Sequence, residues 1–540
     1  AKIWAAVLRL EAVGVQDNFF ELGGDSILAL QMVSRAAQAG LSLSPRQIFQ
    51  HQTIAELATV AEPTAAIATA PMAATGAVPL TPIQQWFFEQ NLEHPHYFNQ
   101  AIHLELPLGS DRRSLDQAIQ QVAGHHDALR LRFERTATGW QQGYAEASRV
   151  EPITWYDLSS LAEGDQVREM ATQAQALQAS LHLQNGPLMR VGGFDLGAER
   201  PSRLLIVLHH LVVDGLSWRI LLEDLLSAYR QGIHGLNAQL PAKTQSFQQW
   251  AIGLQAATQQ AEATLPYWQT LPTATPLPLD HNAGDNTVAA ADTVTVSLSR
   301  QSTQALLQTV PLTYRTEITD VLLTALMQVL TDWTGHTSHL LTLENHGRHP
   351  EELGREFNLS RTVGWFTCLY PVALQLTAAT PDEQLQAIKV QLRQVPHGGL
   401  SYGLLRYGVG RAELARSPQI SFNYLGQFDG LLAEAKGFRL LETPVATRDG
   451  QQQRSHLIDI NGSIRQEQLQ MAWTYSRHHH HRATLEALAH QYMQVLQQLI
   501  EGSQSAIAPA YSPADFSLVE LDQATLEAVL GGVTFQGGGS

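Results

Sequence analysis

Two adjacent histidines at the end of an apolar strand are the first residues here that could do chemistry. Residues 204–208 predict a buried strand that runs into His209 and His210, with Asp214 following and a helix expected from about Trp218. Histidine can transfer protons near neutral pH, whereas Asp214 could simply cap the helix. Taken alone, such a pair is more often structural and hydrogen-bonded than catalytic. A metal site is not expected, because no ligand-rich segment or HEXXH spacing accompanies it.

Ser26 is a second candidate. It follows Gly23 and Gly24, which permit a tight turn, and precedes apolar residues at helical spacing. A serine at a helix start usually caps the helix through its hydroxyl. The functional alternative is a phosphate esterified to Ser26, which would lie at the positive end of the helix dipole.

Glu344 and Cys368 are less informative by themselves. A lone glutamate is usually a solvated surface charge. Cys368, the single cysteine, lies in the apolar run WFTCLY, so we expect a small buried side chain without a catalytic role. One cysteine excludes an intrachain disulfide and a cysteine metal cluster. It is also consistent with a reducing compartment, and we therefore expect a cytoplasmic protein.

The composition narrows the class of protein. Of the 540 residues, 44% are hydrophobic and 16% are charged, which is typical of a folded chain with several domains. Fifty acidic residues against 34 basic ones give a net charge of -16, so nucleic acid is not an expected partner. The longest apolar stretch, 204–213, is shorter than the roughly 20 residues that cross a bilayer. No membrane association is expected.

The elements that position these residues fall into five segments. Helical periodicity predicts a small all-α bundle over 1–62, and an Ala, Thr and Pro-rich linker follows at 63–77. Mixed helix and strand patterns then predict an α/β body, which a Pro-rich break at 271–278 divides into lobes over 78–270 and 271–511. Residues 512–540 are expected to form a C-terminal tail or docking segment.

The serine segment closely resembles a known site. The run DNFFELGGDSI is similar to the phosphopantetheine attachment site of peptidyl carrier domains, and the likeness extends over 1–62. It implies 4′-phosphopantetheine on Ser26, added by a phosphopantetheinyl transferase. Asp25 precedes the serine, as is typical of carriers ahead of epimerisation domains, whereas carriers ahead of condensation domains often have histidine there.

The histidine segment, HHLVVDG, resembles the HHxxxDG signature of the condensation and epimerisation superfamily of non-ribosomal peptide synthetases. This resemblance implies two lobes of chloramphenicol-acetyltransferase-like architecture around a tunnel. It also implies that His210 faces a thioester, with His209 in support, and that Asp214 is mainly structural. Further motifs after the linker resemble those of epimerisation domains: LTPIQQWF, RTVGWFT, ISFNYLGQ, LIDING and WTYS.

Glu344 separates the two branches of the superfamily. It begins the run ENHGRH, which resembles the epimerisation motif EGHGRE with a catalytic leading glutamate that condensation domains lack. Asn345 and His349 depart from that motif and could displace Glu344. The resemblance also implies that Asn423 and Tyr424 support the reaction or bind the enolate oxygen.

The resemblance implies L-to-D epimerisation of an aminoacyl or peptidyl thioester by two-base proton transfer, without a metal. Peptide-bond formation and an inactive carrier-binding module remain the alternatives. An upstream adenylation domain and a downstream condensation domain, in cis or in trans, are the implied partners. His478 to His481 could form a metal tract, but a solvated helix start is expected instead.

Overall fold

The computed structural model describes residues 1–8, 10–63, 74–146, 151–348, 354, 357–377, 380–427, 437–442 and 446–505. The predicted tail at 512–540, most of the predicted linker and His349 lie outside these residues. No helix among the described residues is long and apolar enough to cross a membrane.

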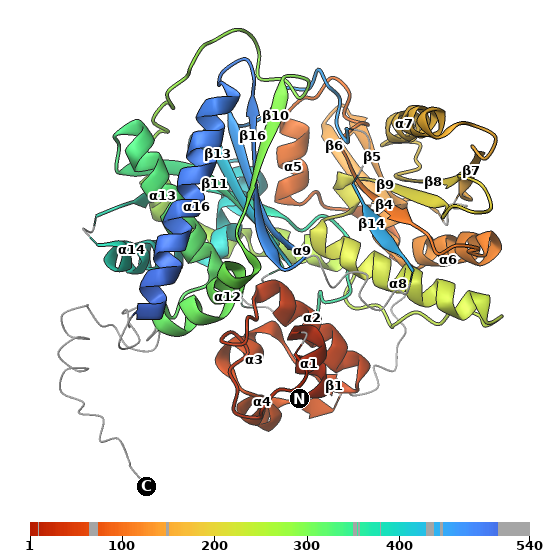
Figure 1. The fold of residues 1–540 in the computed structure, drawn as a ribbon, viewed down its shortest axis with the longest axis horizontal. Coiled ribbons are helices and arrows are strands. Elements are labelled where there is room, and N and C mark those ends of the chain that lie inside the picture. Colours follow the sequence, from red (N-terminus) through yellow and green to blue (C-terminus); the bar gives the residue numbers. More distant parts are fainter. Residues whose placement is uncertain are drawn as a thin grey trace.

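The first segment is a helical bundle with its own apolar core, as predicted (Figure 1). Its elements are α1 (Lys2–Leu8), α2 (Ser26–Gln38), β1 (Leu41–Ser42), α3 (Pro45–Gln50), α4 (Ile54–Val60) and β2 (Glu62–Pro63). Asp25 caps α2 by accepting from the Leu28 backbone N–H at 2.8 Å. Ser44 and Thr53 form capping boxes that begin α3 and α4, so polar residues in the loops set where these helices start.

The first half of the α/β body holds two sheets in which all strand pairs are antiparallel except β7 with β8. Their strands are β3 (Gly76–Val78), β4 (Asn99–Glu105), β5 (Leu131–Thr136), β6 (Gly139–Tyr144), β7 (Thr154–Asp157), β8 (Met189–Asp195) and β9 (Arg203–His209). The helices are α5 (Pro82–Glu89), α6 (Arg112–His125), α7 (Glu163–Ala179), α8 (Gly215–Ile233), α9 (Phe247–Ala256), α10 (Thr258–Ala261) and α11 (Leu265–Gln269). The strand predicted over 204–208 is the buried β9, and its end leads through a short 3-10 turn, η2 (His210–Val212), into α8.

The second half is built on one six-stranded sheet in the order β10-β16-β15-β13-β11-β12. Its strands are β10 (Ala291–Ser297), β11 (Ser338–Asn345), β12 (Cys368–Gln375), β13 (Ile420–Gln427), β15 (Ile458–Arg465) and β16 (Gln468–Ser476). The helices α12 (Arg300–Tyr314), α13 (Ile318–Thr334) and α16 (Arg482–Ser505) lie together beside this sheet in Figure 1, with α14 (Pro381–Arg393) next to them. A short helix, α15 (Leu400–Gly403), contacts β12.

One strand crosses between the halves. The segment β14 (Arg439–Leu441) comes from the second half of the sequence, yet it pairs antiparallel with β4 and forms the edge of the five-stranded sheet β14-β4-β9-β8-β7. Nothing in the hydrophobic pattern predicts this exchange, because a three-residue strand has no readable period. The two lobes therefore share a sheet as well as an apolar core.

Candidate active site

His210 is held in one tautomer by its neighbours. Its Nδ1 lies 2.8 Å from the Val213 carbonyl oxygen, which can only accept, so Nδ1 carries the proton. The other ring nitrogen, Nε2, lies 2.9 Å from Gln100 Nε2 and accepts from that amide. Trp218 Nε1 donates to Gln100 Oε1 at 2.8 Å and so fixes the orientation of the amide. The lone pair of His210 Nε2 is therefore held by the Gln100 amide at the end of β9, and a substrate proton would have to displace that hydrogen bond.

The surroundings of His210 also favour its neutral form. Burial, with a further contribution from the positive charge of Arg448, lowers the pKa of His210 to about 4. Neutral imidazole is the form that accepts a proton. At neutral pH the ring is consequently a proton acceptor at Nε2.

His209 has a different role. Its ring is fully buried, with Nε2 2.9 Å from the Pro95 carbonyl oxygen, and Nδ1 accepts from the Leu211 backbone N–H. Burial lowers the pKa of His209 to about 3. Both nitrogens are engaged by the backbone, so His209 shapes the turn after β9.

Glu344 lies near the end of β11, in register with Leu369 of β12 and Asn423 of β13. Burial raises the pKa of Glu344 to about 7, while Arg448 and a hydrogen bond with Asn423 partly oppose the rise. The side chain keeps partial access to solvent. A carboxyl group with a pKa near the working pH can both take and give a proton.

Asp214 joins the two halves of the body through hydrogen bonds. It caps α8 through the Ser217 backbone N–H at 2.7 Å and accepts from Arg348 Nη2 at 3.1 Å and from the Phe366 N–H at 3.0 Å. Arg348, fully enclosed, also donates to the Leu359 and Thr362 carbonyls. The sequence motif included Arg348 without assigning it a role.

Asn423 and Tyr424 point to different neighbours. Asn423 lies beside Glu344 in the parallel pair β11–β13. Tyr424 is half-buried, with its pKa raised well above the usual value by desolvation and by Asp25, and Arg219 opposes that rise. Its hydroxyl has no hydrogen-bond partner in the part of the chain that is described. Tyr424 therefore belongs to the side of the site that faces the helical bundle.

The helical bundle contacts the body through the start of α2 (Figure 1). A Cβ placed on Gly426, at the end of β13, would lie 2.9 Å from Ile27 Cδ1, 3.7 Å from Asp25 Oδ2 and 3.8 Å from Arg219 Nη2. Burial raises the pKa of Asp25, and Arg219 opposes the rise. Ser26 thus begins a helix that contacts the body beside Tyr424. Tyr424 belongs to β13, the strand that pairs with β11 and so with the strand of Glu344.

This helix start suits a phosphate ester. Gly23 has a φ of +92°, and a Cβ on Gly24 would lie 2.4 Å from the Phe19 ring, so both positions require glycine. The turn they form leads directly into the 13-residue helix α2, whose first backbone N–H groups favour an anion.

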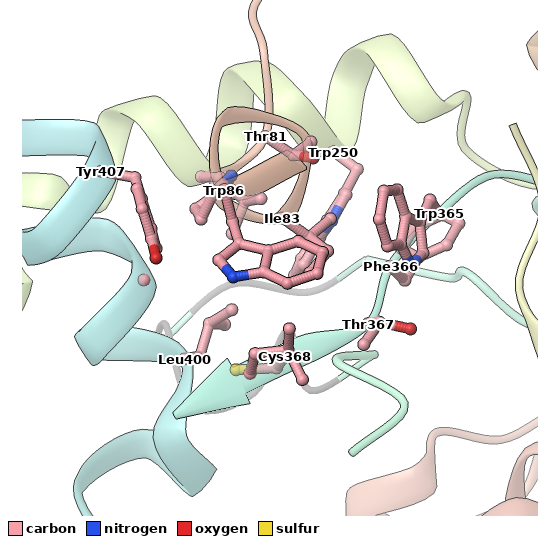
Figure 2. Close-up of a pocket in the computed structure, with 14 residues that line it drawn as sticks. Thr81, Ile83, Trp86, Trp250, Trp365, Phe366, Thr367, Cys368, Leu400 and Tyr407 are labelled. Atoms are coloured by element: carbon pink, nitrogen blue, oxygen red, sulfur yellow. The ribbon is translucent and has the colours of Figure 1, made fainter. Parts of the chain in front are cut away.

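A cavity with mostly apolar walls lies between Trp365, Trp86 and Leu400 (Figure 2). Trp365 lines it and also contacts His210, with ring centres 4.2 Å apart. Leu369, the cross-strand neighbour of Glu344, lines it as well. The other lining residues carry no formal charge; they include Trp86, Trp250, Phe366, Cys368, Leu400 and Tyr407. Cys368 is buried as expected, and burial raises the pKa of its thiol to about 12.

The prediction of a solvated start for the histidine tract is wrong for one residue. His480 is 1% exposed and packs on Trp333, with ring centres 5.9 Å apart, because α16 begins against α13. The tract's ligand atoms do not converge. Among described residues, converging metal-ligand atoms occur at His125, His126 and Asp224, where Asp224 is already bonded to His126 and Arg361.

Two residues near His210 were missed by sequence reasoning. Gln100 binds Nε2, and Arg448 influences the pKa of both His210 and Glu344. Neither lies in a motif quoted above. A single sequence holds no signal for them, since Gln100 lies 110 residues from His210.

A small helical bundle precedes a two-lobed α/β body, and His210 at the end of β9 contacts Trp365 of the second lobe. Residues 74–517 match the family model "Condensation domain", and residues 1–61 match "Phosphopantetheine attachment site". The chain belongs to the condensation-domain family, with a phosphopantetheine-bearing carrier domain before it. The attachment-site match gives covalently attached 4′-phosphopantetheine as its cofactor.

Relatives and solved structures agree with this membership. The chain is 44% identical to chondramide synthase cmdD of Chondromyces crocatus and 36% identical to tyrocidine synthase 2 of Brevibacillus parabrevis, over 98% of its length in each case. It spans 14% and 15% of those proteins. The crystal structure of the epimerization domain from the third module of tyrocidine synthetase B is similar at a TM-score of 0.74 and 35% identity, covering 80% of this chain and 97% of that one.

The teicoplanin X-domain shares the fold, at a TM-score of 0.64 and 20% identity, covering 79% of this chain and 95% of the X-domain. The predicted fold class, a small all-α carrier bundle and a two-lobed chloramphenicol-acetyltransferase-like body, is therefore confirmed. The resemblance to synthetase carrier and condensation or epimerisation domains is confirmed as well.

Proposed function

We propose that this chain inverts the α-carbon of an aminoacyl or peptidyl group from L to D while that group is held as a thioester on the arm of Ser26. The observation that carries the proposal is Glu344, a carboxyl group beside Asn423 whose pKa burial raises to about 7, in a body where His210 is kept neutral. Epimerisation needs one group that takes a proton and another that gives one. The 35% identity to a tyrocidine synthetase epimerization domain supports the same assignment.

The chemistry divides between the arm and these side chains. When attached to Ser26, 4′-phosphopantetheine supplies a thioester, whose α-hydrogen is more acidic than that of an amide. At neutral pH, His210 Nε2 accepts a proton and the Glu344 carboxyl group holds one to deliver. The opposite direction starts with ionised Glu344 as the acceptor. Apolar walls around Trp365 exclude water and sharpen the electrostatic effects of nearby charges.

The partners of this function follow from the family. A phosphopantetheinyl transferase would modify Ser26, an adenylation domain upstream would load the arm, and a condensation domain downstream would take the product, in cis or in trans. Two features favour epimerisation over peptide-bond formation: Glu344 at the start of a run that resembles the epimerisation motif, and Asp25 ahead of Ser26.

Exchange of the α-proton with solvent tests the proposal. The chain is loaded at Ser26 with an L-aminoacyl group and placed in deuterated buffer, and the released amino acid is analysed by mass spectrometry and chiral chromatography. We expect deuterium at the α-carbon together with a mixture of enantiomers. The Ser26→Ala variant should accept no arm and give neither signal. A loaded wild-type chain that retains its α-hydrogen and its L configuration would identify an inactive carrier-binding module or a condensation domain.

A further inference from the structure

Arg448 is a cation close to both candidate acid and base groups. Its backbone forms an isolated β-bridge with Phe98, and its guanidinium carbon lies 4.2 Å from the centre of the Phe98 ring. The same Phe98 ring stacks near His210, with ring centres 5.7 Å apart. The charge of Arg448 acts on Glu344 as well, since it lowers the pKa of that carboxyl group. A single guanidinium therefore lies within electrostatic range of both residues.

The neighbouring charges are already paired. Asp214 binds Arg348 at 3.1 Å, and Asp459 binds Arg454 at 2.6 Å. Within the described ranges, the side chain of Arg448 makes no hydrogen bond and no ion pair. Its guanidinium lies over the Phe98 ring. The site thus holds one cation without a bound carboxylate.

The guanidinium of Arg448 is open to a bound molecule. Its side chain is exposed to solvent, although the surrounding protein lowers its pKa through burial. A guanidinium that makes no ion pair within the described residues can donate charge-assisted hydrogen bonds to a negative group supplied by the substrate.

We propose that Arg448 donates hydrogen bonds to the carbonyl oxygen of the bound thioester and stabilises the negative charge that develops there during proton removal. This proposal rests on the epimerase function proposed above. As the α-proton moves to His210 or Glu344, the C–H electron pair forms a carbon–carbon double bond and the carbonyl π pair moves to oxygen. Delivery of a proton to the opposite face reverses both shifts, so no oxidant or further reactant is needed.

The proposal predicts a pattern of α-proton exchange rates that differs from the pattern expected after loss of the acid or the base. Both directions of inversion pass through the same oxygen anion, so neutralising Arg448 should slow proton exchange equally from both faces. The Arg448→Met variant should exchange the α-proton of L- and D-loaded chains about 100-fold to 1,000-fold more slowly than wild type. Arg439→Met is a matched control, since Arg439 pairs with Glu105 on the exposed edge of β14.

A pH profile separates this role from that of a mere counter-ion to Glu344. If Arg448 only favoured ionised Glu344, Arg448→Met would regain the wild-type exchange rate at high pH, once Glu344 had ionised. We expect instead a plateau that stays at least about 100-fold low. Recovery to the wild-type plateau would overturn the proposal, and so would Arg448→Met exchanging as fast as Arg439→Met.

A third measurement, the titration of Glu344, needs no loaded substrate. In the chain without its arm, NMR titration of the Glu344 carboxyl carbon should show a higher pKa in Arg448→Met than the value of about 7 in wild type. An unchanged titration would mean that the guanidinium does not face the site, which also overturns the proposal. Arg448→Gln provides the same measurements if the Met variant does not fold. Absence of exchange in the wild type would instead reject the epimerase function itself.

Discussion

At the scale of single residues, His210 and Glu344 differ in how they are supported. The His210 ring is fixed by two hydrogen bonds, to Val213 and Gln100, and is kept neutral, whereas the pKa of Glu344 is set by burial and by Asn423. If each serves one face of the α-carbon, His210→Ala and Glu344→Gln should each slow inversion by about 100-fold to 10,000-fold. Each variant should still exchange deuterium from its remaining face.

The two variants should label opposite enantiomers of the loaded thioester, which chiral chromatography with mass spectrometry would measure. Labelling of the same enantiomer by both variants would contradict separate faces. Unimpaired inversion in Glu344→Gln would show that Asn345 and His349 mark a displaced loop and that Glu344 is not the second base.

Ionisation of Glu344 should also make the free energy of unfolding depend on pH. Its pKa rises from 4.5 to about 7 on folding, so the folded state holds the proton more tightly. The stabilisation from this proton is complete below pH 4.5 and is lost as the pH rises through 7. Glu344→Gln should therefore gain free energy of unfolding relative to wild type as the pH rises from 4.5 to 8, by at most about 3 kcal/mol.

Denaturant unfolding at several pH values would measure this difference. Glu199→Gln, at an exposed turn, is the matched control and should show no pH-dependent gain. A Glu344→Gln difference that stays constant with pH would mean that the carboxyl group is not desolvated in the folded chain.

At the scale of elements, α2 presents its first turn to the body. Asp25 caps that helix and also faces Arg219, so one side chain serves both folding and docking. Asp25→Asn keeps a good capping group but removes the charge. We expect inversion to slow about tenfold, which corresponds to about 1.4 kcal/mol, with arm attachment at Ser26 unchanged.

Rates of inversion and of arm attachment in the full chain would test this expectation. Arg35→Ala is the control, because the Arg35–Glu223 pair spans 3.9 Å, is largely solvated and should contribute little. Equal rates for Asp25→Asn and wild type would show that the charge of Asp25 does not hold the carrier in place.

These elements also show what the sequence could predict. A continuous apolar run predicted β9, and the polar residue Asp214 lies where the next helix starts, because such signals are local. The sequence could not predict a role for Arg448, because that role depends on Phe98, Glu344 and His210, which come together from distant segments. The burial of His480 was missed for the same reason: its partner Trp333 lies on another helix.

At the scale of the whole molecule, the candidate acid and base come from different halves of the chain. His210 follows β9, and Glu344 lies near the end of β11, so the distance between them depends on how firmly the halves are joined. The crossing strand β14 contributes one connection, and the enclosed pair Asp214–Arg348 contributes another. This pair joins the cap of α8 to the loop after β11 and to Phe366.

Removing one partner of this pair should weaken the whole body. Asp214→Ala leaves Arg348 enclosed without a counter-charge and uncaps α8, so we expect a loss of about 3 to 5 kcal/mol in the free energy of unfolding. Replacing both partners, as Asp214→Ala with Arg348→Met, should cost less than the sum of the two single changes, because no unpaired charge remains. Denaturant unfolding of the four proteins in this cycle measures the coupling. If the single costs simply add, the pair does not join the halves, and the spacing of His210 and Glu344 must depend on the shared apolar core and β14 instead.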